Sequence, residues 1–497
     1  MEMHEEARRA GAEINASAAE GKASASLFDA ESLAVSLKRG VRLHETDGRA
    51  VLVDADGVAL ALPLPPETRR IFLSALEEGT YTANELGDAV LHTAPSTDAA
   101  SLYYVLAQLE RGRWFRYALR SGGRNTATLE PFSLRFDFAD TSVTGRYRLS
   151  RFACLRREGD DAALESPLGH GRLLLHTPEA AGLAASLSRP LSFEEMRVSH
   201  PALAPKEIGA LLAMMRSVGA LFPCDAEVRI PEDGSGPLRQ WEFHDLLFHS
   251  RSRQGRHGNP VGGSCPFLGE ILPLPGVKRP MSAERVPLHR PETGEMRADF
   301  FELAEMRRSL RTQGEGERAL RLKELGTFLH FTGGVREILP ASPEKGYWYE
   351  ASLRPCAGSG AIHELEYYLT VARCDGLPPG LYRYDPLAHT LERLEADENQ
   401  LEKLLKGADR AMRGARCDVL ITLAARFQRV SWQYRSIAYS LLLKDVGAVF
   451  QQMYLAATAL DLAPCALGAG DSDDFAETAG LDYFSETSVG EFALSGR

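Results

Sequence analysis

The sequence lacks the features that would place it in a membrane. Its 497 residues contain no run of 18 or more apolar residues, whereas a membrane-spanning helix needs about 20. The first 26 residues are polar and have no apolar core of the kind found in a secretory signal peptide. We therefore expect a cytoplasmic protein that begins with a flexible segment over residues 1–37.

Paired cysteines and an excess of positive charge are also missing. The seven cysteines stand singly, and no two of them have the spacing of a zinc motif. This pattern predicts reduced thiols and no structural metal site. The net charge of -11 argues against a nucleic-acid partner, because such partners need a basic surface.

Residues 38–125 have the pattern of a small module of strands and three helices. Short β-rich runs come first, and apolar residues then recur at helical spacing in three successive segments. We predict helices at 66–78, 82–91 and 98–111, followed by a strand at 114–119. Strands, three helices and a closing strand are the order of a winged-helix-like module.

Residues 126–225 repeat that order and predict a second winged-helix-like module. Helices are expected at 178–187, 192–198 and 205–218, with a short strand at 220–222. The segment LYYVLAQLERGRWF at 102–115 also has a counterpart in IGALLAMMRSVGALF at 208–222. We interpret the two stretches as a duplicated module, although two unrelated α+β units would give a similar pattern.

The remaining chain divides into a connector and a larger domain. Residues 226–298 are rich in Pro, Gly, Arg and His and have no sustained period, so we expect a connector there. Helices and strands alternate over residues 299–497, with a buried strand at 417–427 and a long helix at 437–460. The apolar face of this helix is too broad for the surface, which favours the core or a subunit interface.

Three polar clusters within residues 299–497 are candidates for a functional site. RRSLR at 307–311 combines guanidiniums and a hydroxyl that could hold a phosphate and a polyol, although a solvated basic patch has the same composition. RPCAGSGA at 354–361 has small residues that allow the backbone to approach a flat ring, although it could be merely a turn. SWQYR at 431–435 follows the predicted buried strand.

Taken in order, these clusters resemble the nitroreductase-like flavoproteins, and more closely their SagB-type branch of FMN-dependent azoline dehydrogenases. The resemblance covers residues 300–497. It includes GLYRYDP at 380–386, DVGAVFQQMYLAATALDL at 445–462 and SVGEFALSG at 488–496. It implies an α+β protein with a C-terminal nitroreductase-like FMN domain, here preceded by two winged-helix-like modules of the type that hold a leader peptide.

The resemblance also implies an activity and partners. SagB-type enzymes oxidise thiazolines and oxazolines in ribosomally synthesised precursor peptides to thiazoles and oxazoles. The expected partners are therefore a precursor peptide and a cyclodehydratase. The family fold further implies a homodimer in which two subunits share each FMN, with the long helix at their interface.

Individual residues receive roles by their place in these motifs. Carried over from the family, the residues that would hold the phosphate, ribityl chain and pyrimidine edge of FMN are Arg307, Arg308, Ser309 and Arg311. The residues that would pack along the isoalloxazine ring are Ser359, Gly360 and Ala361. Further candidates for contacts with the cofactor are Leu467, Gly468 and Arg497.

The position of the proton acceptor departs from the family pattern. Azoline dehydrogenases typically have Lys-Tyr where this chain has Gln433 and Tyr434. A glutamine carries no charge, so it neither accepts a proton nor lowers the pKa of Tyr434. With an ordinary pKa of about 10, Tyr434 alone is a poor base at neutral pH. Two alternatives therefore stay open: a flavin oxidoreductase acting on another natural-product intermediate, and a non-catalytic peptide-binding scaffold for a cyclodehydratase.

Overall fold

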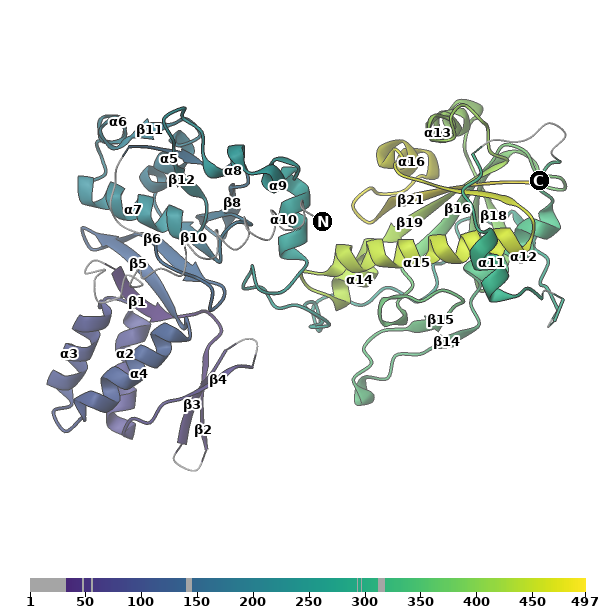
Figure 1. Ribbon diagram of the computed structural model, residues 1–497. Helices are drawn as coiled ribbons and strands as arrows, with labels where there is room; N and C mark the ends of the chain where they lie inside the picture. Colours follow the sequence, from purple (N-terminus) through teal and green to yellow (C-terminus); the bar gives the residue numbers. More distant parts are fainter. Residues whose placement is uncertain are drawn as a thin grey trace. The chain divides into compact units, whose positions relative to one another are not determined.

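The computed structural model describes residues 33–46, 49–54, 57–139, 145–292, 294–295, 297–311 and 318–497. Residues 1–32, which make up most of the expected flexible segment 1–37, lie outside these ranges. The chain forms two compact units, Met1–Pro260 and Val261–Arg497 (Figure 1). Within the described ranges, no helix is long and apolar enough to cross a bilayer.

The first unit is built around a six-stranded antiparallel sheet in the order β1-β5-β6-β10-β9-β8. Its strands are β1 (Leu33–Leu37), β5 (Phe115–Ser121), β6 (Arg124–Pro131), β8 (Cys154–Glu158), β9 (Asp161–Glu165) and β10 (Gly171–Leu175). Two three-stranded sheets accompany it: β2 (Arg42–Thr46), β3 (Arg49–Val53) and β4 (Ala59–Ala61), and then β11 (Leu191–Ser192), β7 (Arg146–Leu149) and β12 (Leu221–Pro223). Because β5, which precedes residue 125, pairs with β6, and β6 pairs with β10, one sheet spans the expected boundary at residue 125.

Two groups of three helices pack in this unit (Figure 1). The first is α2 (Pro66–Glu78), α3 (Ala83–Thr93) and α4 (Ala99–Arg111), and the second is α5 (Pro178–Ser186), α6 (Phe193–Ser199) and α7 (Pro205–Ser217). All six helices lie within two residues of their predicted bounds. Capping explains this agreement, since Thr82 and Ser192 each form a capping box with the glutamate three residues later.

The segments 102–115 and 208–222 adopt the same local structure. Four buried residues have the same spacing on both helices: Leu102, Val105, Leu106 and Leu109 in one, and Ile208, Leu211, Leu212 and Met215 in the other, where Ala213 and Met214 are buried as well. Each helix also ends in the same way, because the residues in the left-handed conformation are Arg113 (φ 56°) and Gly219 (φ 67°). A duplicated module would have this correspondence, and we propose that the two arose in that way.

Residues 226–260, expected to belong to a connector, complete the first unit. They form α8 (Pro231–Gly234), α9 (Gly236–Arg239) and α10 (Phe243–Arg251). The buried carboxylate of Glu232 accepts a hydrogen bond from the Ser150 hydroxyl at 2.5 Å and from the Arg151 amide at 2.7 Å. These bonds fasten α8 to the turn after β7.

The second unit has a seven-stranded antiparallel sheet in the order β13-β18-β17-β16-β19-β21-β20. Its strands are β13 (Arg285–Pro287), β16 (Leu365–Val371), β17 (Gly380–Asp385), β18 (Thr390–Leu394), β19 (Val419–Arg426), β20 (Ala463–Leu467) and β21 (Glu486–Ser495). A two-stranded sheet, β14 (Glu337–Leu339) and β15 (Ala351–Leu353), lies apart from it. The fold class is α+β, as the sequence predicts.

Helices cover both faces of this sheet (Figure 1). The helices that pack on one face are α12 (Leu322–Thr332) and α15 (Ala438–Ala459), and those on the other are α13 (Glu398–Ala411) and α16 (Ser472–Ala479). The long predicted helix is thus α15, whose side facing the sheet is buried at Leu442, Val446, Val449 and Met453.

A buried ion network fixes the middle of the sheet. Arg383 is fully buried and pairs with Glu392 at 2.7 Å and with Glu366 at 3.2 Å. Arg426 contacts the same Glu366 at 3.4 Å. Buried charges are tolerated when they are paired, so this network ties β16, β17, β18 and β19 together beside the start of β16, where the candidate site lies.

Candidate active site

The WQY motif lies at the end of a short helix that the sequence analysis did not predict. Strand β19 ends at Arg426, and α14 (Phe427–Gln433) separates it from Tyr434. The buried guanidinium of Arg429 donates to the carbonyls of Ile362, at 2.7 Å, and Glu350, at 2.8 Å. Helix α14 thereby positions the loop before β16 next to Tyr434.

Three segments meet at Tyr434: residues 262–265, 358–363 and 433–436. A Cβ atom on Gly360 would lie 2.8 Å from the hydroxyls of both Tyr434 and Tyr349, so only glycine fits there. Positive φ values occur within the three segments at four non-glycine residues, Cys265, Ala361, His363 and Ser436. Such strained conformations gather at functional sites, where the surrounding structure holds them.

Gln433 is held by the segment that begins the second unit. The Cys265 thiol donates to the side-chain oxygen of Gln433 at 3.1 Å, and the Cys265 amide donates to the Gln433 backbone carbonyl at 3.1 Å. Gly263 lies against the side-chain nitrogen, where a Cβ would approach to 2.9 Å. The structure therefore brings Gln433 and Tyr434 together with Gly360, and gives Gln433 an anchoring contact.

Tyr434 is a neutral phenol in this environment. Partial burial raises its pKa, and the nearby carboxylate of Asp445 raises the pKa further. Burial, and then the neighbouring Tyr434, raise the pKa of Tyr349. Both hydroxyls can therefore donate hydrogen bonds or relay protons at neutral pH, but neither is a ready phenolate base.

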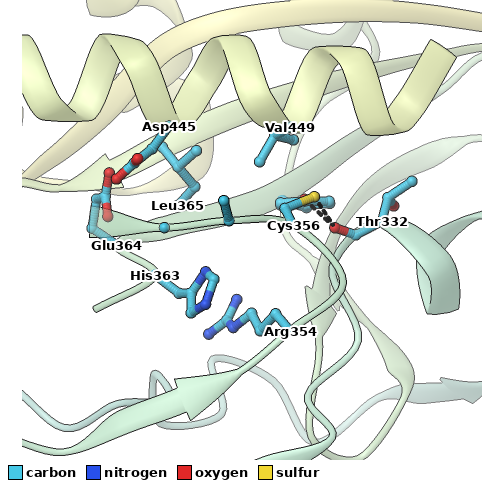
Figure 2. Close-up of a pocket in the computed structure, with 11 residues that line it drawn as sticks. Thr332, Arg354, Cys356, His363, Glu364, Leu365, Asp445 and Val449 are labelled. Carbon is cyan, nitrogen blue, oxygen red and sulfur yellow. Dashed lines mark hydrogen bonds between the residues drawn. The ribbon is translucent and has the colours of Figure 1, made fainter. Parts of the chain in front are cut away.

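Two carboxyl groups face each other beside this turn, and the sequence analysis singled out neither. Asp445 comes from α15 and accepts hydrogen bonds from the amide of Ser359 at 2.9 Å and from its hydroxyl at 3.1 Å. Figure 2 shows Asp445 reaching from the helix toward Glu364, which immediately precedes β16. Burial, and then the charge of Asp445, raise the pKa of Glu364 to about 7.

A small cavity adjoins the carboxyl pair. Its volume is about 20 Å³, which is room for about one water molecule. Arg354 and His363 lie on its opposite side (Figure 2). Burial, together with the positive charges of Arg354 and Arg429, lowers the pKa of His363 to about 4, so His363 is neutral at pH 7.

The RRSLR motif lies beside the C-terminal part of α15. It follows α11 (Phe300–Met306), and the Ser309 hydroxyl lies 2.7 Å from the hydroxyl of Tyr454. The Arg307 guanidinium stacks 5.1 Å from the centre of the Tyr454 ring. Among the described residues, no carboxylate forms an ion pair with Arg307, Arg308 or Arg311, so these guanidiniums are placed to receive an anion.

These two groups of residues lie on opposite flanks of α15. Asp445, which holds Ser359, and Tyr454, which contacts Ser309, are nine residues apart. At about 100° and 1.5 Å per residue, this spacing places them half a turn apart and about 13 Å apart along the axis. Within one chain, the 307–311 and 359–361 groups therefore flank the helix on different sides.

The other predicted cofactor residues lie on the side of the RRSLR group and not of Tyr434. Strand β20, which ends at Leu467, adjoins that group, because the Leu310 amide donates to the Pro464 carbonyl at 2.8 Å and the Ala466 amide donates to the Tyr454 hydroxyl at 2.8 Å. Leu467, followed by Gly468, is buried at the end of β20 in the apolar cluster beneath α13 and α16. Arg497 pairs with Asp461 at 3.0 Å, just past the C-terminal end of α15, whereas Tyr434 precedes its N-terminal end. The structure thus does not bring Leu467 or Arg497 to Tyr434.

Comparison with protein-family models decides the class. Residues 307–494 match the model of the nitroreductase family, and residues 147–258 match the model of the cyanobactin oxidase ThcOx. Residues 307–494 form a nitroreductase-family domain. The chain is accordingly an oxidoreductase that joins this domain to a segment of cyanobactin-oxidase type, which confirms the SagB-type resemblance. Proteins of the nitroreductase family typically use a flavin.

The individual proteins that resemble this chain have low sequence identity to it. A protein of Methanocaldococcus jannaschii provisionally named a nitroreductase is 29% identical over 150 residues, which are 30% of this chain and 69% of that protein. A provisional nitroreductase structure from Ralstonia eutropha JMP134 has a TM-score of 0.33 at 19% identity, covering 48% of this chain and 98% of that one. A chain of the Escherichia coli microcin synthetase McbBCD complex with truncated pro-MccB17 has a TM-score of 0.32 at 19% identity, covering 42% and 77%.

Proposed function

We propose that this protein is an FMN-dependent azoline dehydrogenase, which oxidises thiazoline or oxazoline rings of a ribosomally synthesised precursor peptide to thiazoles or oxazoles. The observation that carries the proposal is that one chain combines a nitroreductase domain with a cyanobactin-oxidase segment. The geometry around Tyr434 supports it, because it supplies a partly buried polar site with strained backbone and titratable groups.

The residues of the second unit fit an FMN. The guanidiniums of Arg307 and Arg311, which have no carboxylate partner among the described residues, would hold the phosphate. The Ser359–Ala361 turn would lie along the flavin ring, since Gly360 has no Cβ to hold the ring away. When bound, FMN supplies the acceptor for a hydride.

A second copy of the chain would complete each flavin site. The 307–311 and 359–361 groups lie on opposite flanks of α15, so a single flavin would contact both groups if they came from different subunits. The face of α15 turned away from the sheet is exposed at Leu443, Gly447 and Gln451. We infer that this face packs against the same helix of the partner in a homodimer.

In this site the protein's own residues orient the ring and handle its proton. Oxidation of an azoline removes a hydride and a proton, and the hydride requires the flavin. The Tyr434 hydroxyl, held beside Gly360, takes part in the proton transfer as a neutral relay. Gln433 keeps the 262–265 segment over Tyr434 through its bonds with Cys265.

The first unit has a basic cleft that fits an acidic stretch of peptide. The cleft has a volume of about 750 Å³, and the described residues that line it include Arg135, Arg253 and Arg256 but no carboxylate. Burial, and then the positive charges of Arg135 and Arg251, lower the pKa of Arg256. Exposed Leu134 and Trp241 add apolar contact area. We infer that a precursor segment with acidic and apolar residues binds there.

Charge reversal in this cleft is expected to weaken peptide binding. The double variant Arg135→Glu/Arg253→Glu should bind a fluorescent peptide of glutamate and leucine about tenfold more weakly, with a smaller salt dependence, because attraction becomes repulsion. Fluorescence anisotropy measures the affinity, and Arg189→Glu, an exposed site outside the cleft, is the control. Equally tight binding of a lysine–leucine peptide by the unmodified protein would contradict the inference.

Gln433 gives the second candidate function its support. A flavin oxidoreductase acting on a different natural-product intermediate would not need the lysine that azoline dehydrogenases typically carry at this position. Mass spectrometry of an azoline-containing peptide separates the two, because the proposed reaction removes two hydrogens, about 2 Da, from each ring. Flavin that is reduced by another intermediate, with no mass change in the azoline peptide, would favour the second candidate.

The visible absorption spectrum tests the cofactor and the scaffold alternative together. We expect a yellow protein that releases about one FMN per chain on denaturation. A colourless protein that cannot be loaded with FMN would leave the peptide-binding scaffold as the better account.

A further inference from the structure

We propose that Glu364 and Asp445 form a carboxyl pair that accepts the substrate proton through Tyr434, in the place of the lysine that this chain lacks. The inference rests on the proposed function for the identity of the reaction. Azoline dehydrogenases typically have a lysine where this chain has Gln433. In this chain the base would instead be two carboxylates next to the Ser359–Gly360 turn.

The arrangement of hydrogen-bond acceptors favours one proton on the pair. Glu364 is fully buried, and neither of its oxygens has a donor among the described residues. Its carboxyl instead faces that of Asp445, another acceptor (Figure 2). Two buried acceptors attract each other when one of them carries a proton, and they repel each other when both are ionised.

The pair is also connected to the Tyr434 site. Asp445 is anchored by the amide and hydroxyl of Ser359, and the next residue, Gly360, lies against the Tyr434 hydroxyl. The charges of Asp445 and Glu364 both raise the pKa of Tyr434, which shows that the three groups are electrostatically coupled. The protonation of the pair and that of Tyr434 therefore depend on each other.

Other groups around the site are poorer proton acceptors at neutral pH. Burial lowers the pKa of His363 to about 4 and raises the pKa of Cys265, so the first is a weak base and the second stays a thiol. Glu364 has a pKa of about 7, near the value that suits a general base at neutral pH. The titratable and charged groups that face the pair are Arg354, His363, Arg429, Tyr434 and Lys444.

Oxidation of the azoline ring transfers one hydride and one proton to different acceptors. The azoline ring loses one hydrogen as a hydride, with its electron pair, to the flavin of the proposed function. It loses a second hydrogen as a proton to the Tyr434 oxygen, while the Tyr434 hydroxyl proton moves to the doubly ionised pair. The pair changes from two negative charges to one, and release of that proton to solvent restores it. Glu364 is thus a positioning residue for the proton, acting through Tyr434.

Glu364→Gln tests this role without removing the contact. The amide keeps the shape of the side chain and can donate to Asp445, so the fold should persist. In the flavin-loaded protein we expect azoline oxidation to slow at least about tenfold and to lose its rise with pH near neutrality. Glu364→Asp, which restores a carboxyl group, should recover part of the rate and the pH dependence. Glu491→Gln, which changes a buried carboxyl on the other face of the sheet, is the matched control.

Two readouts do not depend on turnover. Infrared titration of the protein as purified should show a carboxylic-acid carbonyl band that disappears as pH rises through about 7 and is missing in Glu364→Gln. Because folding raises the pKa of Glu364, its contribution to stability is complete below the unfolded pKa of 4.5 and is lost as pH rises through about 7. Glu364→Gln should therefore raise the melting temperature above pH 7 and flatten its pH dependence.

The outcomes separate this inference from the proposed function. If Glu364→Gln keeps the rate and its pH dependence, or if the infrared band does not change with the substitution, the carboxyl pair is not the proton acceptor. If the unmodified protein binds flavin but oxidises no azoline, the proposed function fails, and the infrared titration still reports whether the pair holds a proton. Loss of the band together with loss of the pH-dependent rate would establish the role.

Discussion

Replacing both Arg307 and Arg311 by alanine is expected to yield a protein that no longer retains flavin. A charge-assisted hydrogen bond contributes about 1.5–3 kcal/mol, so the two losses together should weaken FMN binding by about 150- to 25,000-fold. The fold should persist, because neither guanidinium forms an ion pair with a described carboxylate and both lie outside the hydrophobic cores. The ratio of flavin to protein absorbance, with titration of added FMN, measures the effect.

The control for this prediction is Arg410→Ala, which removes an exposed arginine from α13 in the same domain and should keep its flavin. A complementation experiment then examines the proposed sharing of sites. A chain with Arg307→Ala/Arg311→Ala is co-expressed with a chain carrying Gly360→Phe, whose side chain would obstruct the turn against Tyr434. A mixed dimer has one site with both defects and one intact site, so flavin should return to about half occupancy. If the mixed dimer binds no flavin, a site built from two subunits is contradicted.

Several helices of both units could be predicted because their signals are local. The predicted helix 66–78 coincides with α2, since a proline begins it and Gly79, in the left-handed conformation, ends it. Helix α15 was predicted to within one residue at each end from its run of apolar residues. Helix α14 escaped prediction because FQRVSWQ contains β-favouring Phe, Val and Trp directly after a buried strand, and what holds it is the tertiary bonding of Arg429.

Part of the candidate active site could also be predicted, because some of its residues belong to local sequence motifs. Tyr434 and the Ser359–Ala361 turn belong to motifs that can be read along the chain, and the structure brings them together at Gly360. Glu364 stands in a β-rich segment where a glutamate ordinarily faces solvent. Its burial depends on α15, which comes much later in the sequence and places Asp445 over it. Pairings between distant segments of this kind leave no local pattern, so neither carboxylate could be singled out.

Tyr434→Phe is expected to separate catalysis from flavin binding. The substitution removes one hydroxyl and keeps the ring that packs beside Gly360, so flavin content and melting temperature should stay close to those of the unmodified protein. The rate of azoline oxidation should fall by about 100- to 1,000-fold, because the proton loses its path to the Glu364–Asp445 pair. Single-turnover reduction of the flavin by an azoline peptide, followed by absorbance, measures this step.

Tyr349→Phe is the matched comparison, since its hydroxyl also converges on Gly360 but donates to the Gly360 carbonyl at 3.0 Å. We expect a smaller loss of rate there, because that bond supports the turn and does not lead to the carboxyl pair. The double variant Tyr434→Phe/Glu364→Gln tests most directly whether the two residues act on one proton path. If both residues act on one proton path, the double variant should be hardly slower than Tyr434→Phe alone, whereas independent roles would multiply the two losses.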